Sequence, residues 1–282
     1  MTRRIVFAAL VALVLAPPSF AGTWLKSVGA AQKAAKEKNQ LILVDMFAEW
    51  CGWCHRFERE VFPAAAFQDA TKDIVLLRLD TEDRAEGTQF ARKYSVTSLP
   101  TFLVLAPDLT IAGIIRGYAP PNEFVARLKE TRKSYESFLV KLQNEPKLGK
   151  DWVGRLTLAK ELTSRGAYDK SIPRLKALTA EKGMPAAIRD DAYYQLAVAY
   201  AVQSKYDESL KTIKQLTSLS KLGEAVEQAQ VLAGNIYLDQ GNLLGARNQF
   251  KFFIDTYPQS QYAANVETML TEIERRLAAG MK

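Results

Sequence analysis

The sequence predicts an α/β domain with a mixed central sheet and helices on both faces, followed by an all-helical repeat domain. Short apolar runs alternate with helical segments over the first 145 residues, whereas no strand pattern remains from residue 151 to the end. With 282 residues, of which 48% are hydrophobic and 24% charged, the chain is long enough for two ordinary domains. We expect them to occupy residues 22–145 and 150–282, after a leader at 1–21.

The leader has the pattern of a secretory signal peptide. Arg3 and Arg4 precede the apolar run 5–16, two prolines follow, and small residues allow cleavage after Ala21. The apolar run is too short to cross a bilayer core of ~30 Å comfortably, which favours a cleaved signal over a retained anchor. We expect a periplasmic or otherwise extracytoplasmic protein, without a stable membrane span after cleavage, in a compartment where disulfides persist.

The elements of the first domain follow from two patterns. Nearly continuous apolar runs indicate buried strands, and they occur at 41–47, 74–79, 102–105 and 111–115. Helical spacing or composition predicts helices at 26–38, 54–62, 86–94 and 121–142. Pro121 suits the first turn of the last helix, where its missing N–H costs nothing. This order implies a central mixed sheet, with the fourth strand paired back on the third.

The second half contains a helical repeat. Three turns, at 166–168, 204–206 and 241–243, begin 38 and 37 residues apart. The last unit resembles a tetratricopeptide repeat in its residues and spacings, carrying Gly234, Tyr237, Gly241, Ala246, Phe250 and Pro258. Small residues let paired helices approach and aromatic residues fill the seam, while 261–277 is expected to form a capping helix. The run 252–260 also resembles repeats of envelope-located assembly proteins. We expect this domain to bind a protein partner.

The formal net charge of +7 comes from lysines and arginines spread among acidic residues on solvated helix faces. The sequence has no basic stripe with interleaved aromatic residues, so we expect no nucleic-acid partner. The charge pattern is that of an ordinary solvated surface.

The only two cysteines stand in the run Trp50-Cys51-Gly52-Trp53-Cys54. A disulfide across so short a loop restrains little of the unfolded chain, because cross-link stabilisation grows with loop length. The spacing of the two cysteines therefore favours a chemical role over a stabilising disulfide.

The run 44–54 closely resembles the thioredoxin superfamily. The resemblance extends over about residues 24 to 142 and includes a strand ending near Asp45, the Cys-x-x-Cys pair at a helix start, and Leu99-Pro100-Thr101 before a strand. It implies an α/β thioredoxin fold and thiol–disulfide oxidoreductase activity, with no cofactor beyond the Cys51–Cys54 disulfide. It also implies disulfide or dithiol protein substrates and a redox partner that recharges the site.

The resemblance assigns roles to three groups. Cys51, at a helix N-terminus that favours negative charge, is the attacking thiolate. Cys54, one turn further in and more buried, resolves the mixed disulfide. Asp45 corresponds to the buried aspartate that accepts the Cys54 proton, directly or through water, and burial should raise its pKa.

The resemblance also outlines the substrate side of the site. Pro100 matches the family's cis-proline, which would place the backbone of Leu99 beside the cysteines for pairing with an extended peptide. Trp50 and Trp53 would flank the sulfurs, and the dipeptide Gly52-Trp53 would cap the helix and face outward.

Three departures from thioredoxin stand out. The dipeptide lacks thioredoxin's proline, Arg59 replaces a kinking proline, and Leu76 replaces a buried lysine, so Asp45 is expected to lack a charged partner. The stretch 54–62 is similar instead to the C-terminal periplasmic domain of DsbD and related exported proteins. That subgroup passes electrons to oxidised partners, which favours a reductase, although a dipeptide does not define the direction.

Other interpretations of these residues stay open. Cys51 to His55 also matches the Cys-x-x-Cys-His signature of c-type haem attachment, with Met46 the nearest second axial ligand. Two cysteines and one histidine leave a structural zinc site one ligand short, so no metal is expected. Alternatively, the chain is an envelope scaffold in which the thioredoxin-like domain only binds peptides.

Overall fold

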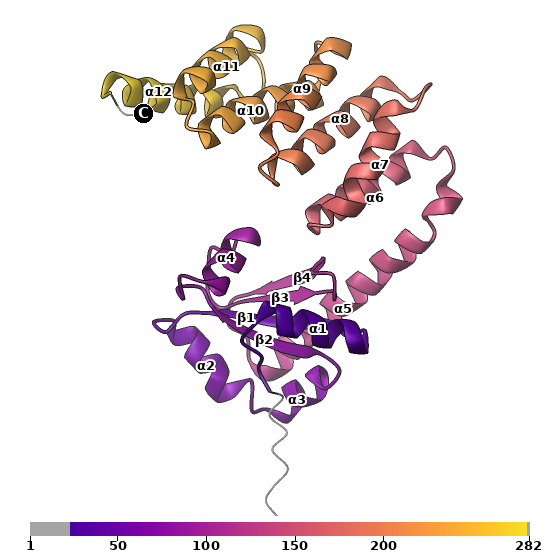
Figure 1. The fold of residues 1–282 in the computed structure, drawn as a ribbon, viewed down its shortest axis with the longest axis vertical. Helices are drawn as coiled ribbons and strands as arrows, with labels where there is room; N and C mark the ends of the chain where they lie inside the picture. Colours follow the sequence, from indigo (N-terminus) through magenta and orange to yellow (C-terminus); the bar gives the residue numbers. More distant parts are fainter. Residues whose placement is uncertain (1–22, 281–282) are drawn as a thin grey trace, which may run out of the picture. The chain divides into compact units, whose positions relative to one another are not determined.

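A computed structural model describes residues 23–280 (Figure 1). The predicted signal peptide lies outside the described residues. The structure divides into two compact units, one holding residues 23–108 and 114–130 and the other holding 109–113 and 131–280. The unit boundaries fall inside a strand and a long helix, and the domain limits 22–145 and 150–282 stay predictions.

A four-stranded sheet in the order β2-β1-β3-β4 forms the centre of the first part of the chain. β1 runs parallel to β2 and antiparallel to β3, so the sheet is mixed, as predicted. Every predicted strand is present within one residue at each end, with bounds β1 Ile42–Phe47, β2 Val75–Asp80, β3 Thr101–Leu105 and β4 Ile111–Arg116. The isolated bridge between Leu25 and Leu77 extends the sheet on the far side of β2.

Five helices accompany this sheet among the described residues: α1 Val28–Lys38, α2 Gly52–Glu60, α3 Ala65–Thr71, α4 Glu86–Lys93 and α5 Pro121–Gln143. The sequence did not predict α3, because seven residues are too few to show a helical period. Nevertheless α3 places Phe67 in the core with only 1% of its surface exposed. α2 begins two residues earlier than predicted, which matters for the site described below.

Buried phenylalanines hold α2 against the sheet. The ring of Phe57 on α2 lies 4.7 Å from that of Phe102 on β3 and 5.1 Å from that of Phe124 on α5. Phe67 on α3 joins them at 5.9 Å from Phe124. Each side chain is almost fully buried. Such offset and edge-on aromatic pairs stabilise beyond their buried area, so the helix that carries the cysteines has a rigid base.

From residue 152 to residue 280 the chain is helical apart from the turns between helices, as predicted. Its helices are α6 Trp152–Ser164, α7 Tyr168–Ala180, α8 Ala186–Ala201, α9 Tyr206–Leu219, α10 Glu224–Asp239, α11 Leu243–Thr256 and the capping α12 Ala263–Ala278. The three turns fall where the repeat places them. Each begins with a residue in the left-handed region, with φ +72° at Gly166, +57° at Ser204 and +71° at Gly241.

The small residues of the repeat let neighbouring helices approach. A Cβ on Gly234 of α10 would come within 2.2 Å of the ring of Phe250 on α11, so only glycine fits without movement. Phe250 and Phe253 are fully buried in a cluster that continues from α8 to α12. No helix among residues 23–280 is long and apolar enough to cross a membrane.

Candidate active site

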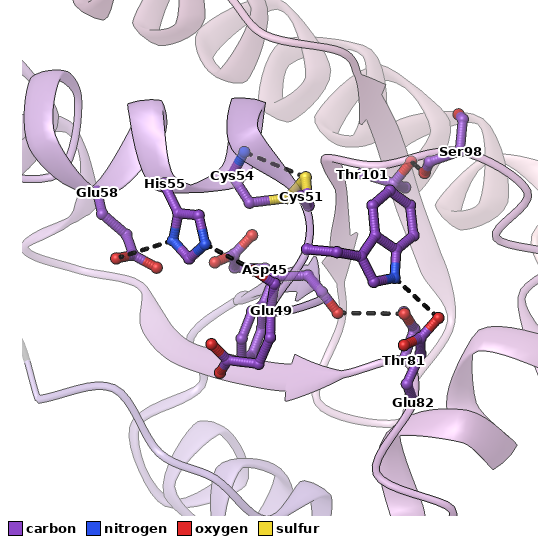
Figure 2. The surroundings of a disulfide bond; sticks show 12 residues. Asp45, Glu49, Cys51, Cys54, His55, Glu58, Thr81, Glu82, Ser98 and Thr101 are labelled. Atoms are coloured by element: carbon purple, nitrogen blue, oxygen red, sulfur yellow. Dashed lines mark hydrogen bonds and ion pairs between the residues drawn. A yellow bond between two sulfur atoms is a disulfide. The ribbon is translucent and has the colours of Figure 1, made fainter.

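Cys51 and Cys54 form a disulfide at the N-terminus of α2 (Figure 2). Because α2 begins at Gly52, Cys51 occupies the N-cap position, and its Sγ accepts a hydrogen bond of 3.1 Å from the backbone N–H of Cys54. The unpaired N–H groups of a helix N-terminus favour negative charge at such a position. Cys54 is slightly more buried than Cys51, at 1% against 3% exposed.

Asp45 is the buried carboxyl among the residues that surround the disulfide in Figure 2. It lies on β1 with 2% of its surface exposed. Burial raises the pKa of Asp45 to about 7, while the charge of Arg78 lowers this pKa and that of Glu58 raises it. Its Oδ1 has no hydrogen-bond partner among the described residues. A carboxyl that is half ionised near neutral pH can both accept and release a proton.

The expectation that Asp45 lacks a charged partner is wrong. Arg78 lies opposite Asp45 in the β1–β2 register, and its Nε is 3.2 Å from Asp45 Oδ2. Side chains alternate along a strand, so Arg78 shares a face with Leu76, the residue that led to the expectation. The alternation of side chains along the strand therefore predicts that Arg78, two residues after Leu76, faces the same side of the sheet.

The two tryptophans next to the cysteines are exposed, Trp50 by 68% and Trp53 by 54%. The indole N–H of Trp50 donates a hydrogen bond of 2.9 Å to Glu82, which follows β2. The ring of Trp53 lies 5.3 Å from that of Tyr118, which follows β4. Both indoles are therefore exposed but held by contacts from other segments. Gly52, between the cysteines, has open space beside it.

Two contacts of Trp53 escaped the sequence analysis. The guanidinium of Arg56 lies 5.5 Å from the Trp53 ring and 4.7 Å from the Tyr118 ring. Arg56 also pairs with Glu60, which accepts a hydrogen bond from the Tyr118 hydroxyl. Arg56 stands three residues after Trp53, and helical spacing could have revealed their contact. No local sequence pattern predicts the contact between Tyr118 and Trp53.

The peptide bond between Leu99 and Pro100 is cis, as the resemblance implied. Leu99 is half-buried and Pro100 is buried. The Pro100 carbonyl accepts a hydrogen bond of 2.9 Å from Gly117 N–H. Ser98 and Thr101, on either side of this bond, are among the residues around the disulfide in Figure 2, joined by a 2.7 Å hydrogen bond. The roles of Leu99 and Pro100 in substrate binding stay predictions.

His55 is engaged on both sides of its ring. Nε2 lies 2.8 Å from the carbonyl oxygen of Glu49, and Nδ1 lies 3.8 Å from a carboxylate oxygen of Glu58 (Figure 2). The two cysteine sulfurs are bonded to each other. Within residues 23–280, no three His, Cys, Asp or Glu side chains gather as a metal site requires.

Comparison with known protein families gives two matches, one in each part of the chain. Residues 28–132 match the family described as a thioredoxin-like domain. Residues 157–280 match the family described as an outer membrane lipoprotein, YfiO. The two matched ranges do not overlap, and residues 133–156 lie between them.

Individual relatives resemble the first part. The thiol:disulfide interchange protein DsbD of Pseudomonas fluorescens is 35% identical over 118 residues, which cover 40% of this chain and 20% of DsbD. The DsbD of Yersinia enterocolitica is 31% identical over 114 residues, covering 40% and 18%. The chain thus spans about a fifth of the length of the curated relatives it matches.

Among solved structures, the C-terminal domain of DsbD from Neisseria meningitidis in the oxidised form is 16% identical. It matches with a TM-score of 0.35 over 39% of this chain and 100% of that domain. A thioredoxin from Thermus thermophilus is 22% identical, with a TM-score of 0.36 over 39% and 86%. The chain has a thioredoxin-like domain similar to part of DsbD, followed by an all-helical region similar to YfiO.

Proposed function

We propose that this protein is an extracytoplasmic thiol–disulfide oxidoreductase that reduces, or exchanges, disulfides of partner proteins through Cys51 and Cys54. One observation carries the proposal: a helix N-terminus holds the cysteine pair beside a buried carboxyl whose pKa lies at about 7. The similarity to DsbD, itself named for thiol:disulfide interchange, supports the same chemistry. A scaffold that only binds peptides would not require an ionisable group there.

In the reducing direction, the Cys51 thiolate attacks one sulfur of a substrate disulfide. The other substrate sulfur leaves as a thiolate and takes up a proton, and a mixed disulfide joins Cys51 to the substrate. Cys54 then loses its proton to Asp45 and attacks the Cys51 sulfur. The second substrate thiolate leaves and is protonated, so two electrons have passed to the substrate and the protein ends as the Cys51–Cys54 disulfide.

The exposed surface around the pair suits a protein substrate. Trp50 and Trp53 offer apolar contact area that their neighbours hold in place, which lowers the entropy lost on binding. Leu99 and Pro100 supply the backbone beside which an extended peptide lies in this proposal. A separate redox protein recharges the pair after each turnover.

The helical region recruits the partner in this proposal. Stacks of helix pairs usually present an extended binding surface. The similarity of residues 157–280 to an outer membrane lipoprotein family supports a place in the cell envelope, as does the similarity to DsbD. The predicted signal peptide agrees with that location.

Reduction of insulin by dithiothreitol tests the activity. The wild-type chain should accelerate the reaction, whereas Cys51→Ser should not exceed the uncatalysed rate, because the attacking sulfur is gone. Equal rates for the two proteins would refute the enzyme and leave the scaffold. The absorption spectrum of the exported protein completes this test, since a covalent Soret band would identify a haem protein instead.

Two further measurements define the partner and the direction. In Cys54→Ser the mixed disulfide on Cys51 cannot be resolved, so clients should remain attached and become identifiable. The equilibrium reduction potential of the Cys51–Cys54 pair, measured against glutathione, sets the direction of electron transfer. A potential of about −120 mV, as for the strong oxidant DsbA, would reverse the reductase assignment.

A further inference from the structure

We infer that Arg78 is a positioning residue for the exchange reaction: clamped by Glu58, it pairs with one oxygen of Asp45 and leaves the other oxygen available for the proton of Cys54. The inference rests on the proposed function. It concerns a residue that the sequence pattern did not select and whose place only the sheet register defines.

Three contacts fix the guanidinium of Arg78. Its Nε lies 3.2 Å from Asp45 Oδ2, and its terminal nitrogen donates to the carboxylate of Glu58 on α2. The guanidinium carbon also lies 3.9 Å from the centre of the Phe47 ring. With 22% of its side chain exposed, Arg78 is partly removed from water, which strengthens these charge interactions. Asp45 therefore faces a cation that has little freedom to move.

The pairing of Asp45 is one-sided. Oδ2 forms an ion pair with Arg78 Nε, which donates no hydrogen bond, whereas the buried Oδ1 has neither an ion-pair nor a hydrogen-bond partner among the described residues. Arginine–carboxylate pairs frequently form two parallel hydrogen bonds. Here the terminal nitrogen is turned to Glu58 instead. An acceptor kept open in the surroundings of Cys54 suits proton transfer, directly or through a water molecule (Figure 2).

The charges around Asp45 come from two elements. Arg78 on β2 lowers the pKa of Asp45, and Glu58 on α2 raises it. His55, also on α2, lies 3.8 Å from Glu58, and β3 places the uncharged Phe102 opposite Asp45 in register. Loss of the Arg78 charge would remove a cation that lowers the pKa of Asp45 and would leave the negative charge of Glu58 uncompensated. Both effects raise the pKa of Asp45.

This arrangement has a kinetic consequence. If the pKa of Asp45 rose by about 1 unit, the low end of the range for a carboxyl losing an adjacent arginine, the ionised fraction at pH 7 would fall about fivefold. Attack by Cys54 on the mixed disulfide would slow by the same factor, because an Asp45 carboxyl that is already protonated cannot accept the proton of Cys54. The first attack, by Cys51, would not change.

The direct test is a pH titration of the Asp45 carboxyl in the oxidised full-length protein, monitored by carbon-13 NMR. The carboxyl signal of Asp45 is assigned by its loss in Asp45→Asn. Arg78→Met should move the midpoint up by about 1 pH unit. Arg78→Lys, which keeps the charge, should move it less, and Glu58→Gln should move it down. Opposite shifts for Arg78→Met and Glu58→Gln distinguish charge positioning from general loosening of the fold.

Arg92→Met is the matched control, since Arg92 is an exposed arginine at the end of α4. It should leave the titration unchanged. The companion measurement is the pH profile of mixed-disulfide resolution with a small disulfide, in which the inflection should follow the Asp45 midpoint in each variant. A profile for Arg78→Met that coincides with that of Arg92→Met would overturn the inference.

The two proposals fail in different ways. If Cys51→Ser matches the wild type in insulin reduction, the proposed function fails while the NMR titration still decides whether Arg78 controls Asp45. If Cys51→Ser is inactive but Arg78→Met titrates like the wild type, only the role of Arg78 fails. Should Arg78→Met not fold, Arg78→Lys and Glu58→Gln carry the same test with the charge of Arg78 retained.

Discussion

At the scale of single residues, the burial of Asp45 links the chemistry of the site to the stability of the fold. The pKa of Asp45 is about 7 in the folded protein, against an ordinary value of 3.8 for an aspartate exposed to water. The folded state therefore binds this proton more tightly than the unfolded state does. Between these two values the folded state holds more protons, so stability decreases as pH rises from about 4 to about 7.

The first prediction concerns Asp45→Asn in the oxidised protein. The wild type should lose up to roughly 4 kcal/mol over this pH range from Asp45 alone, at about 1.4 kcal/mol per pKa unit. The amide side chain of the variant cannot ionise, so the variant should lack this loss and be the more stable protein above pH 7. Urea unfolding followed by tryptophan fluorescence checks it, and an unchanged pH slope in the variant would assign the slope to other groups.

Trp53 is a second residue whose surroundings suggest a function. A side chain that is 54% exposed, yet packed on Tyr118 and Arg56, is rigid and available at the same time. Rigid, exposed aromatic groups are frequent among the residues that dominate protein interfaces. Their contribution lies in binding rather than in the chemical step.

The second prediction is that Trp53→Ala raises KM for a protein disulfide by about 2- to 10-fold, the range expected for losing one aromatic contact. Its kcat should change little, and reduction of a small disulfide should be unaffected. Lys38→Ala is the control, because Lys38 is an exposed residue at the end of α1. A fall in kcat with unchanged KM would place Trp53 in the chemistry instead.

At the scale of elements, the helical repeat depends on turns that reverse the chain within a few residues. All three turns begin with a left-handed residue, which is glycine at positions 166 and 241 and Ser204 in the middle unit. Non-glycine residues in this region cost roughly 1–2 kcal/mol because the Cβ approaches the following carbonyl oxygen. The middle turn thus adopts the same geometry as its neighbours at an energetic disadvantage.

The third prediction is that Ser204→Gly stabilises the helical region by about 1 kcal/mol. Ser204→Ala is the matched control: it removes the hydroxyl but keeps the Cβ, so it should give no gain. In the opposite direction, Gly241→Ala should destabilise by a similar amount, although open space surrounds its Cβ position. Thermal unfolding followed by circular dichroism checks all three, and a gain from Ser204→Ala would show that the hydroxyl, not the backbone, is unfavourable.

At the scale of the whole molecule, one chain joins a thioredoxin-like domain to a helical region with a buried core of its own. The core of the first unit contains the phenylalanines under α2, and the repeats have separate clusters around Leu175 and Phe250. Separate cores allow the two activities proposed above, exchange and recruitment, to be lost separately. In the proposed function, exchange depends on the cysteine pair and recruitment depends on the helical surface.

The fourth prediction is that a chain ending at residue 145, which retains all of α5, reduces insulin within about twofold of the full-length rate. The same truncation in a Cys54→Ser background should trap far fewer clients in the native envelope. The full-length Cys54→Ser protein is the control. Equal trapping by both would show that the helical region does not recruit the clients.

Much of this molecule was accessible from local sequence patterns. Nearly uninterrupted apolar runs identified the four strands, because a strand buried on both faces needs such a run. A period of 38 and 37 residues located the turns of the repeat. The spacing of Cys51 and Cys54 after a buried strand identified the cysteine pair at a helix N-terminus, where a sulfur meets the free N–H groups of the helix. All three signals are local in sequence.

The tertiary structure decided what depends on register and on long-range contact. Arg78 pairs with Asp45 only because β2 lies beside β1 in one particular register, and a shift of one residue would turn Arg78 to the other face of the sheet. The packing of Tyr118 on Trp53 joins segments 65 residues apart, and α3 is too short for a period of its own. The sequence by itself therefore located the cysteine pair and the fold that holds it, whereas the tertiary structure determined which charges surround the pair, because electrostatic interaction depends on distance in space.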